Sequence, residues 1–261
     1  LQLTENLTLR NIANYAEIKS YLATDGDGYN LPSYDVNPFN ARGLPRDDIR
    51  QYSEELQLQG KALEGRLEYV LGGFYFKNEP NGDQGGTSIS VCPLAYAAFC
   101  NDAGPTGDGA FNTFNGRSVY GVTNESYAAY AQGTYDLGGF TEALDGLRLT
   151  LGYRYTTDKV DGFSQFYKFN GAGYTCTATG IVVADPADCR FEEKSKNSQP
   201  TWTAGLDYKL QPDLLVYGKV SKGYKAGGFN TYAVRPETRT FGPEKVVSYE
   251  AGMKSDFTVQ D

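Results

Sequence analysis

Histidine is absent from the 261-residue sequence, and methionine and tryptophan occur once each. The absence of histidine removes the commonest catalytic base and metal ligand from any mechanism. No nucleophile, base and orienting group form a recognisable constellation, so we expect no enzyme, cofactor or metal. No stretch of about eighteen apolar residues occurs, which excludes a transmembrane helix. Acidic residues outnumber basic ones, 32 to 24, which gives a net charge of −8. This argues against a nucleic-acid partner, which would require clustered Lys and Arg.

The first residues of the sequence do not resemble a signal peptide. The sequence opens at Leu1 without the basic and apolar segments of a signal peptide, and its one methionine is Met253. We therefore expect that a signal peptide has been cut away or that the N-terminal part of a longer protein is missing.

The sequence does contain regular alternation. Between Leu147 and Asp158, every second residue from Leu147 to Tyr155 is apolar. The residues that alternate with them are polar or glycine. A period of two predicts a β-strand with one apolar and one polar face. The pattern recurs at 127–137, 202–210 and 248–257. Segments of roughly ten residues cross a bilayer when tilted, and their polar face explains why the mean hydropathy is negative.

The connections between strands alternate in length. We predict eight strands, at residues 7–22, 49–60, 66–77, 125–137, 147–158, 198–210, 213–224 and 246–258. Short connections at 61–65, 138–146 and 211–212 alternate with long ones at 23–48, 78–124, 159–197 and 225–245. This alternation is typical of an all-β, antiparallel up-and-down transmembrane barrel with short periplasmic turns and long outer loops. An even strand count places both ends of the chain on the periplasmic side.

Aromatic residues support a membrane barrel. The chain has 21 Tyr and 14 Phe, and many lie near predicted strand ends, where interfacial girdles form. Cross-strand aromatic pairs in a soluble sheet are the alternative, but such a sheet does not need ten-residue strands joined by forty-residue loops.

The four cysteines lie in the predicted long loops. Cys92 and Cys100 share one loop, and Cys176 and Cys189 share another, so two local disulfides are the natural pairing for an oxidising exterior. Zinc binding is the alternative, but both spacings exceed that of a zinc knuckle and no histidine completes the set.

Two runs near the C-terminus are distinctive: Val216–Asn230 (VYGKVSKGYKAGGFN) and Phe241–Phe257 (FGPEKVVSYEAGMKSDF). They closely resemble the barrel of TonB-dependent outer-membrane receptors, in which Y-x-x-x-S-x-G-[FY]-K-x-G-G-F-N ends one strand and P-E-x-[VT]-x-x-Y-E-x-G-x-K-S opens the next. Gln51–Leu58, Ser126–Gln132 and Leu151–Thr156 are similar to other strands of that family. The resemblance extends over nearly the whole chain and is weakest in the long loops.

The resemblance implies a barrel of about 22 strands closed by a plug domain. Residues 1–261 are then a partial barrel domain of about eight strands, without the plug, the TonB box or the terminal strand. The implied function is uptake of a scarce nutrient, most often a ferric siderophore, across the bacterial outer membrane. The implied partners are outer-membrane lipid, the TonB complex acting through the missing plug, and the nutrient itself.

Two groups of candidate site residues follow. We expect these polar side chains to line the barrel lumen: Arg148, Arg154, Asp158, Asp207, Glu250 and Lys254. For each of them we favour a contact with the plug or an ion pair within the wall over a direct contact with substrate. We expect outer-loop side chains to contribute to recognition: Tyr96, Phe99, Tyr167, Tyr174 and Arg235.

Two other functions stay open at this point. Eight strands can close into a small complete outer-membrane barrel that acts as an anchor or adhesin without transport. A soluble carbohydrate-binding sandwich would bury its apolar faces against each other. A fragment of a large barrel predicts seven to nine bent strands whose first and last members do not pair, whereas the small barrel requires that pairing.

Overall fold

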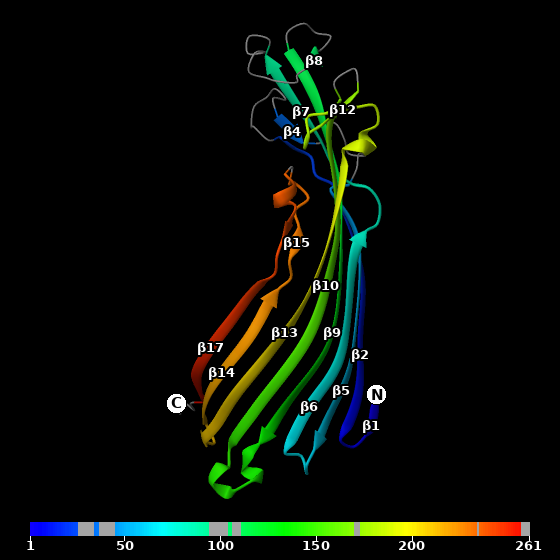
Figure 1. Cartoon of the computed structure of the whole chain (residues 1–261). Helices are drawn as coiled ribbons and strands as arrows, with labels where there is room; N and C mark the ends of the chain where they lie inside the picture. Colours follow the sequence, from blue (N-terminus) through cyan, green and yellow to red (C-terminus); the bar gives the residue numbers. More distant parts are fainter. Residues whose placement is uncertain are drawn as a thin grey trace, which may run out of the picture.

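The computed structural model describes residues 1–25, 34–36, 45–93, 104–105, 111–169, 173–233 and 235–256. Within them, one curved sheet holds 15 strands, and its main path consists of nine antiparallel neighbours (Figure 1). In spatial order these are β1 (Gln2–Thr4), β2 (Leu7–Ser20), β5 (Asp47–Ala62), β6 (Leu67–Pro80), β9 (Phe111–Asp136), β10 (Leu147–Phe169), β13 (Arg190–Gln211), β14 (Leu214–Lys225) and β17 (Glu244–Ser255).

The sheet is not closed on itself. In the described part of the chain, β17 pairs with β14 alone, and β1 and β2 form no ladder with it. The nine-strand path agrees with the predicted open meander, whereas a complete small barrel would need the missing ladder. No helix among the described residues has the length and apolar character to cross a membrane.

All eight predicted strands are present, but three are much longer than predicted. β9, β10 and β13 contain 26, 23 and 22 residues. The sequence pattern predicted that β9 starts near 125, that β10 ends near 158 and that β13 starts near 198, because the contrast between apolar and polar faces stops at these positions. The strands continue because they pair with each other, from Asn124 opposite Val160 to Asn115 opposite Phe169. We call these extensions beyond β6 the projecting strands.

The long connections contain their own short elements. β7 (Gln84–Pro93) pairs along the projecting part of β9, and β11 (Tyr174–Cys176) pairs with the end of β10. The remaining short elements are β3 (Thr24–Asp25), β4 (Tyr34–Val36), β8 (Gly104–Pro105), β12 (Val182–Val183), β15 (Gly228–Phe229), β16 (Thr240–Phe241) and the 3₁₀ helices η2 (Leu137–Gly139), η3 (Glu142–Leu144), η4 (Pro186–Cys189) and η5 (Pro236–Thr238).

The two ends of the sheet differ, as the alternation of loop lengths predicts. One end, here the short-turn end, carries tight connections such as Ala62–Gly65, where Leu63 and Glu64 have φ of 52° and 60°. Positive φ at both central residues matches the twist of the two strands. The start of β2 and the end of β17 lie at this end too, and Figure 1 shows both termini there. The opposite end is the long-loop end.

Register separates the sheet into two faces. Leu149 lies opposite Leu206 and Tyr153 opposite Trp202, so their side chains share one face, here the outer face. The leucine Leu151 on this face is 52% exposed. The pairing ladders place these residues on the outer face: Leu149, Leu151, Tyr153, Trp202, Leu206, Tyr208, Ala251 and Met253. They place these on the inner face: Arg148, Arg154, Asp207, Glu250 and Lys254.

Buried side chains concentrate at the long-loop end. They include Val119, Tyr120, Val160, Ser164 and Phe229 on the projecting strands and the β14–β17 connection. The part of the sheet nearer the short-turn end exposes its apolar side chains instead. The chain therefore packs a core only where loops fold back on the sheet. Nearer the short-turn end, no layer of described residues covers the apolar side chains of the outer face.

Candidate functional site

The inner face carries a polar network within the wall of the sheet. Arg148 Nη2 lies 2.7 Å from Asp207 Oδ1 on the neighbouring strand. The Arg154 guanidinium lies over two rings, 5.0 Å from the centre of Phe74 and 5.5 Å from that of Tyr130. These contacts are cation–π interactions that hold the arginine flat along the sheet.

The other predicted lumen residues also have partners in the wall. Asp158 accepts a hydrogen bond from the Tyr224 hydroxyl. Glu250 accepts one from the Tyr217 hydroxyl at 2.8 Å, and the Lys254 ammonium lies 5.8 Å from the Tyr217 ring centre. All six predicted lumen residues thus make in-wall contacts, and their contact with a plug or a substrate stays a prediction.

The β14–β17 connection folds against the inner face of the projecting strands. We call its described residues, 226–233 and 235–243, the inner strap; Figure 1 shows it beside β10 and β13 at the label β15. Phe229 is buried against Gly162, where an added Cβ would lie 2.3 Å from the ring. The hydroxyl of Ser164, which is fully buried, donates to the Thr231 carbonyl. Glycine at 162 therefore allows the strap to approach the sheet closely.

A second set of contacts holds the C-terminal half of the strap. The Arg239 guanidinium lies 3.7 Å from the ring centre of Phe191, and its Nη1 is 3.8 Å from Glu193 Oε1. Phe191 also contacts Phe229, with ring centres 6.2 Å apart. The strap is thus attached to both β10 and β13.

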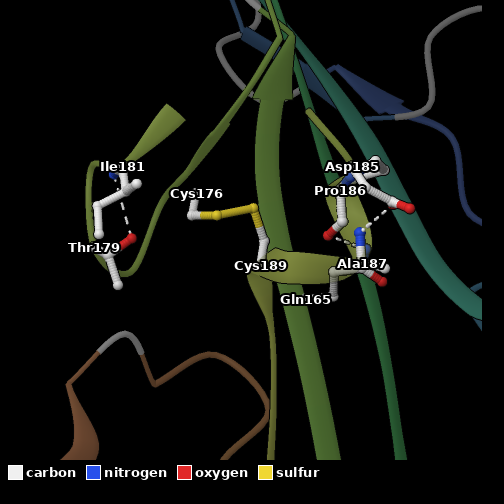
Figure 2. The surroundings of a disulfide bond; sticks show 8 residues. All are labelled: Gln165, Cys176, Thr179, Ile181, Asp185, Pro186, Ala187 and Cys189. Atoms are coloured by element: carbon white, nitrogen blue, oxygen red, sulfur yellow. Dashed lines mark hydrogen bonds between the residues drawn. A yellow bond between two sulfur atoms is a disulfide. The ribbon is translucent and has the colours of Figure 1, made fainter. Parts of the chain in front are cut away.

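A disulfide closes the β10–β13 connection. Figure 2 shows the bond between Cys176, at the end of β11, and Cys189, at the end of η4. The Gln165 amide of β10 donates to the Pro186 carbonyl, and Asp185 caps η4 by accepting from the Ala187 N–H at 2.8 Å (Figure 2). This confirms the predicted pairing of Cys176 with Cys189. Cys100 of the other predicted pair lies outside the described residues, so that pair stays a prediction.

A cavity of about 480 Å³ lies where the strap, β7 and the projecting parts of β9 and β10 meet. This volume is within the usual range for small-molecule sites. Its lining residues include three cations and four aromatic residues: Arg46, Arg117, Lys168, Tyr120, Tyr167, Tyr232 and Phe166. Alternation along β9 and β10 places Tyr120, Phe166 and Lys168 on the inner face with the strap, whereas the side chains of Arg117 and Tyr167 point to the outer face. Three glycines, Gly85, Gly86 and Gly116, expose backbone on the same lining. Such a lining suits an anionic ligand with flat, unsaturated groups.

Aromatic contacts tie the cavity to the strap. The Tyr232 ring centre lies 5.7 Å from that of Tyr120 and 5.9 Å from that of Phe166. The Tyr120 hydroxyl donates to the Arg46 carbonyl at 3.2 Å. Burial and the adjacent Tyr232 hydroxyl raise the pKa of Tyr120, so its side chain is a neutral hydrogen-bond donor at neutral pH.

A polar network below the cavity positions β5 and β7. Asp48 is buried, and its carboxylate lies 2.8 Å from the Lys19 ammonium. Its backbone N–H donates to the side chain of Gln84, the first residue of β7, at 2.8 Å. The hydrogen bond from Lys19 lowers the pKa of Asp48, and a second one from Asn81 acts in the same direction against burial.

The predicted outer-loop residues have different positions. Tyr167 lines the cavity, and Tyr174 packs edge-on against it with ring centres 5.4 Å apart. Arg235 precedes η5 and does not contribute to the lining. Tyr96 and Phe99 lie outside the described residues, so their role stays a prediction.

Sequence reasoning missed most of the cavity lining, including Arg46, Arg117, Tyr120 and Tyr232. The available signal was weak: each lies within or beside a predicted long connection, where cations and aromatic residues are common on any surface. A metal site is not indicated, because the described ranges contain no group of three or more Cys, Asp or Glu side chains arranged to hold an ion.

An open, antiparallel wall with short turns at one end and a ligand-sized cavity at the other defines a segment of a receptor-type barrel. The family described as "TonB dependent receptor-like, beta-barrel" matches residues 1–261. The chain therefore belongs to this family, which consists of transport receptors and not of enzymes.

Individual relatives agree with this assignment. The "Probable TonB-dependent siderophore receptor PiuA" of Acinetobacter baumannii is 24% identical over 290 residues, which cover 98% of this chain and 34% of that protein. The crystal structure of the "ferric yersiniabactin uptake receptor FyuA" of Yersinia pestis matches with a TM-score of 0.63 at 18% identity, over 97% of this chain and 32% of that one.

The crystal structure of the siderophore receptor PiuA from Acinetobacter baumannii gives a TM-score of 0.60 at 18% identity, over 98% of this chain and 36% of that one. At these identities the structural matches establish the fold. The chain spans about a third of the length of the relatives it matches.

Proposed function

We propose that this chain is part of the barrel wall of a bacterial outer-membrane receptor that takes up a ferric siderophore. The cavity at the long-loop end is the observation that carries the proposal, because it joins the cations Arg46 and Lys168 to the aromatic residues Tyr120, Phe166 and Tyr232. The names of the relatives, a siderophore receptor and a ferric yersiniabactin receptor, support the same ligand class.

The chemistry of the cavity fits this ligand. Siderophores hold iron through anionic oxygen atoms, so arginine and lysine side chains complement the complex by charge-assisted hydrogen bonds. Aromatic siderophore groups can stack on Phe166 and Tyr232, which lie beside the same space. The neutral Tyr120 hydroxyl adds a donor without adding negative charge.

The two faces and two ends of the sheet give the proposed orientation. The exposed apolar outer face lies in the lipid of the outer membrane, and the polar inner face lines the lumen. The short-turn end faces the periplasm and the long-loop end faces the exterior. Energy for uptake comes from the TonB complex through a plug domain, which is not part of this stretch of chain.

The test uses the full-length receptor and a panel of ferric siderophores of the phenolate, catecholate and hydroxamate classes. Arg46→Gln and Lys168→Gln should each weaken binding of the cognate complex about tenfold or more, because a hydrogen bond to a charged group contributes about 1.5 to 3 kcal/mol. Equilibrium binding to the purified receptor and radioiron uptake by cells measure this.

Arg66→Gln is the matched control, because Arg66 is an exposed arginine at the short-turn end. It should bind like the unmodified receptor. Undiminished binding by a receptor carrying both cavity substitutions, or equal loss in the control, would contradict the assignment of the cavity to the ligand.

A further inference from the structure

The connection between β6 and β7 contains an asparagine–glycine pair outside any strand. Asn81 and Gly82 follow the last residue of β6 and precede Gln84, the first residue of β7. Both are exposed, and the Gly82 N–H has no hydrogen-bond partner in the described part of the chain. No ladder therefore holds the Gly82 nitrogen away from the Asn81 side chain.

An asparagine followed by glycine can lose its side-chain amide without an enzyme. The backbone nitrogen of the glycine bonds to the side-chain carbonyl carbon of the asparagine. The amide C–N bond of the side chain breaks, and ammonia leaves with the proton of the backbone N–H. Water then opens the five-membered succinimide ring and yields aspartate or isoaspartate. Glycine favours the attack because it has no Cβ to crowd the ring.

The sequence has two other asparagine–glycine pairs for comparison. Asn115–Gly116 lies in β9, where Gly116 is opposite Ser88 of β7 on one side and Lys168 of β10 on the other. These two ladders hold the backbone extended and must open before the ring can close. Asn170–Gly171 lies outside the described residues. Of the two pairs that the structure describes, Asn81–Gly82 is therefore the one placed to react.

The product of this reaction would meet a carboxylate that is already buried. Asn81 Nδ2 lies 3.4 Å from Asp48 Oδ1, and the Asn81 N–H donates to the Asp48 carbonyl at 2.8 Å. Within the described ranges, Lys19 is the one cation paired with the buried Asp48 carboxylate. Deamidation would replace an amide donor by a second carboxylate, and like charges this close repel each other. Isoaspartate would also lengthen the main chain by a methylene group.

The same junction holds the start of β7 beside the cavity. The Asp48 N–H donates to the side chain of Gln84 at 2.8 Å. The Gly85 N–H donates to the Pro45 carbonyl, also at 2.8 Å. Gly85 and the next residue, Gly86, line the cavity. Displacement of Asp48 would therefore loosen one wall of the cavity.

We propose that Asn81 is a site of spontaneous deamidation, and that its conversion to aspartate or isoaspartate releases the start of β7 from β5. Exposure of Asn81 and the glycine at 82 permit the reaction, whereas the adjacent Asp48 carboxylate makes its product destabilising. This modification concerns the ageing of the receptor and does not depend on which ligand the cavity binds.

The test incubates full-length receptor in mild detergent at pH 8, in water enriched in oxygen-18. Peptide mapping by mass spectrometry measures conversion at each asparagine, because every opened ring takes up labelled oxygen. Conversion at Asn81 should exceed that at Asn115 about tenfold or more, because the ladders of β9 must open before Asn115 can react.

Gly82→Ala is the matched control. It keeps the Asn81 amide and adds a methyl group that hinders ring closure. The fold accepts it, because the nearest atom to the added Cβ is Asp48 Oδ2 at 4.0 Å. Conversion at Asn81 should be several-fold slower in this variant than in the unmodified receptor.

Hydrogen exchange of the Asp48 and Gly85 amides measures the effect on β7. Exchange at both should be faster in the incubated receptor and in Asn81→Asp, which carries the product from the start. It should change little in incubated Gly82→Ala. Combining Asn81→Asp with Asp48→Asn should alter exchange at Gly85 by less than the sum of the single effects, because one carboxylate then remains.

Two results would overturn the site itself: an Asn81 amide that survives the incubation, or equal rates of conversion at Asn81 and Asn115. Conversion at Asn81 with unchanged exchange at Asp48 and Gly85 would overturn the proposed release of β7. Siderophore binding is not a readout of this experiment, so failure of the proposed function would leave its outcome standing.

Discussion

Single residues decide whether the inner strap can approach the sheet. Gly162→Ala should displace the strap, because the new methyl group would lie 2.3 Å from the Phe229 ring, and overpacking of this kind costs about 1 to 3 kcal/mol. Faster hydrogen exchange of backbone amides at 228–233 measures the displacement. Gly73→Ala is the control, because nothing lies within 4 Å of its added Cβ. Unchanged exchange in both variants would mean that the strap is not held at this contact.

The carboxylate of Asp48 should make the start of β5 and β7 sensitive to acid. Its pKa is lowered in the folded chain by the Lys19 hydrogen bond, so its stabilising effect is present above the unfolded pKa near 3.9 and is lost as the pH falls through the lower folded value. Asp48→Asn should therefore reduce amide protection at Asn81 and Gln84 at pH 6, and the reduction should be smaller at pH 3, below the unfolded pKa. A reduction of equal size at both pH values would show that the charge is not responsible.

Some residue assignments could be made from sequence and others could not. The alternation placed Arg148 and Asp207 on one face, and the ion pair between them follows from adjacent strands in register. Arg154 could not be matched to Phe74, because that contact crosses β9 and depends on the curvature of the sheet. The cavity lining was missed for the same reason, since its side chains come from connections whose paths no local pattern specifies.

At the scale of one strand, the two faces of β10 should tolerate charge unequally. Leu151→Arg should cost about 2 to 4 kcal/mol of insertion free energy near the bilayer midplane, whereas Thr150→Arg on the inner face should be nearly neutral. Folding of the full-length receptor into lipid vesicles measures both penalties. Equal penalties would show that the apolar face packs against protein rather than lipid.

The disulfide should act on one connection and leave the wall intact. Replacing Cys176 and Cys189 with serine removes a crosslink between residues 13 apart, which corresponds to about 3 kcal/mol of loop-closure entropy. We expect faster proteolysis within 173–189 and an unchanged midpoint for unfolding of the whole receptor. A large fall in that midpoint would show that this connection stabilises the barrel itself.

The sequence predicted which segments form strands more reliably than it predicted how long those strands are. The eight predicted strands rest on a period-two pattern that lipid and lumen impose on opposite faces. Beyond Lys159 in β10 this contrast ends, and the strand is held by pairing with β9 and β13. The Gly-Gly-Phe-Asn run at 227–230 was recognisable, but its packing on Gly162 depends on a distant strand.

At the scale of the whole molecule, the open edges are the least protected feature. β17, and β2 beyond its short pairing with β1, leave backbone groups unpaired along one side within the described chain, and unpaired edges recruit other strands. Residues 1–261 folded alone in detergent should therefore form dimers and larger assemblies, whereas the full-length receptor should be monomeric. Size-exclusion chromatography with light scattering distinguishes the two, and a monomeric fragment would indicate that its edges have closed on each other.

The described wall starts and finishes at the same end of the sheet, since β2 begins and β17 ends at the short-turn end. A block of this kind can be duplicated, deleted or exchanged between genes without inverting any strand that follows it. Each hairpin brings its own long loop, so such exchange would transfer recognition surface together with the wall. Under the proposed function, a barrel of this kind could acquire a new ligand by recombination of whole hairpins as well as by point mutation in the cavity.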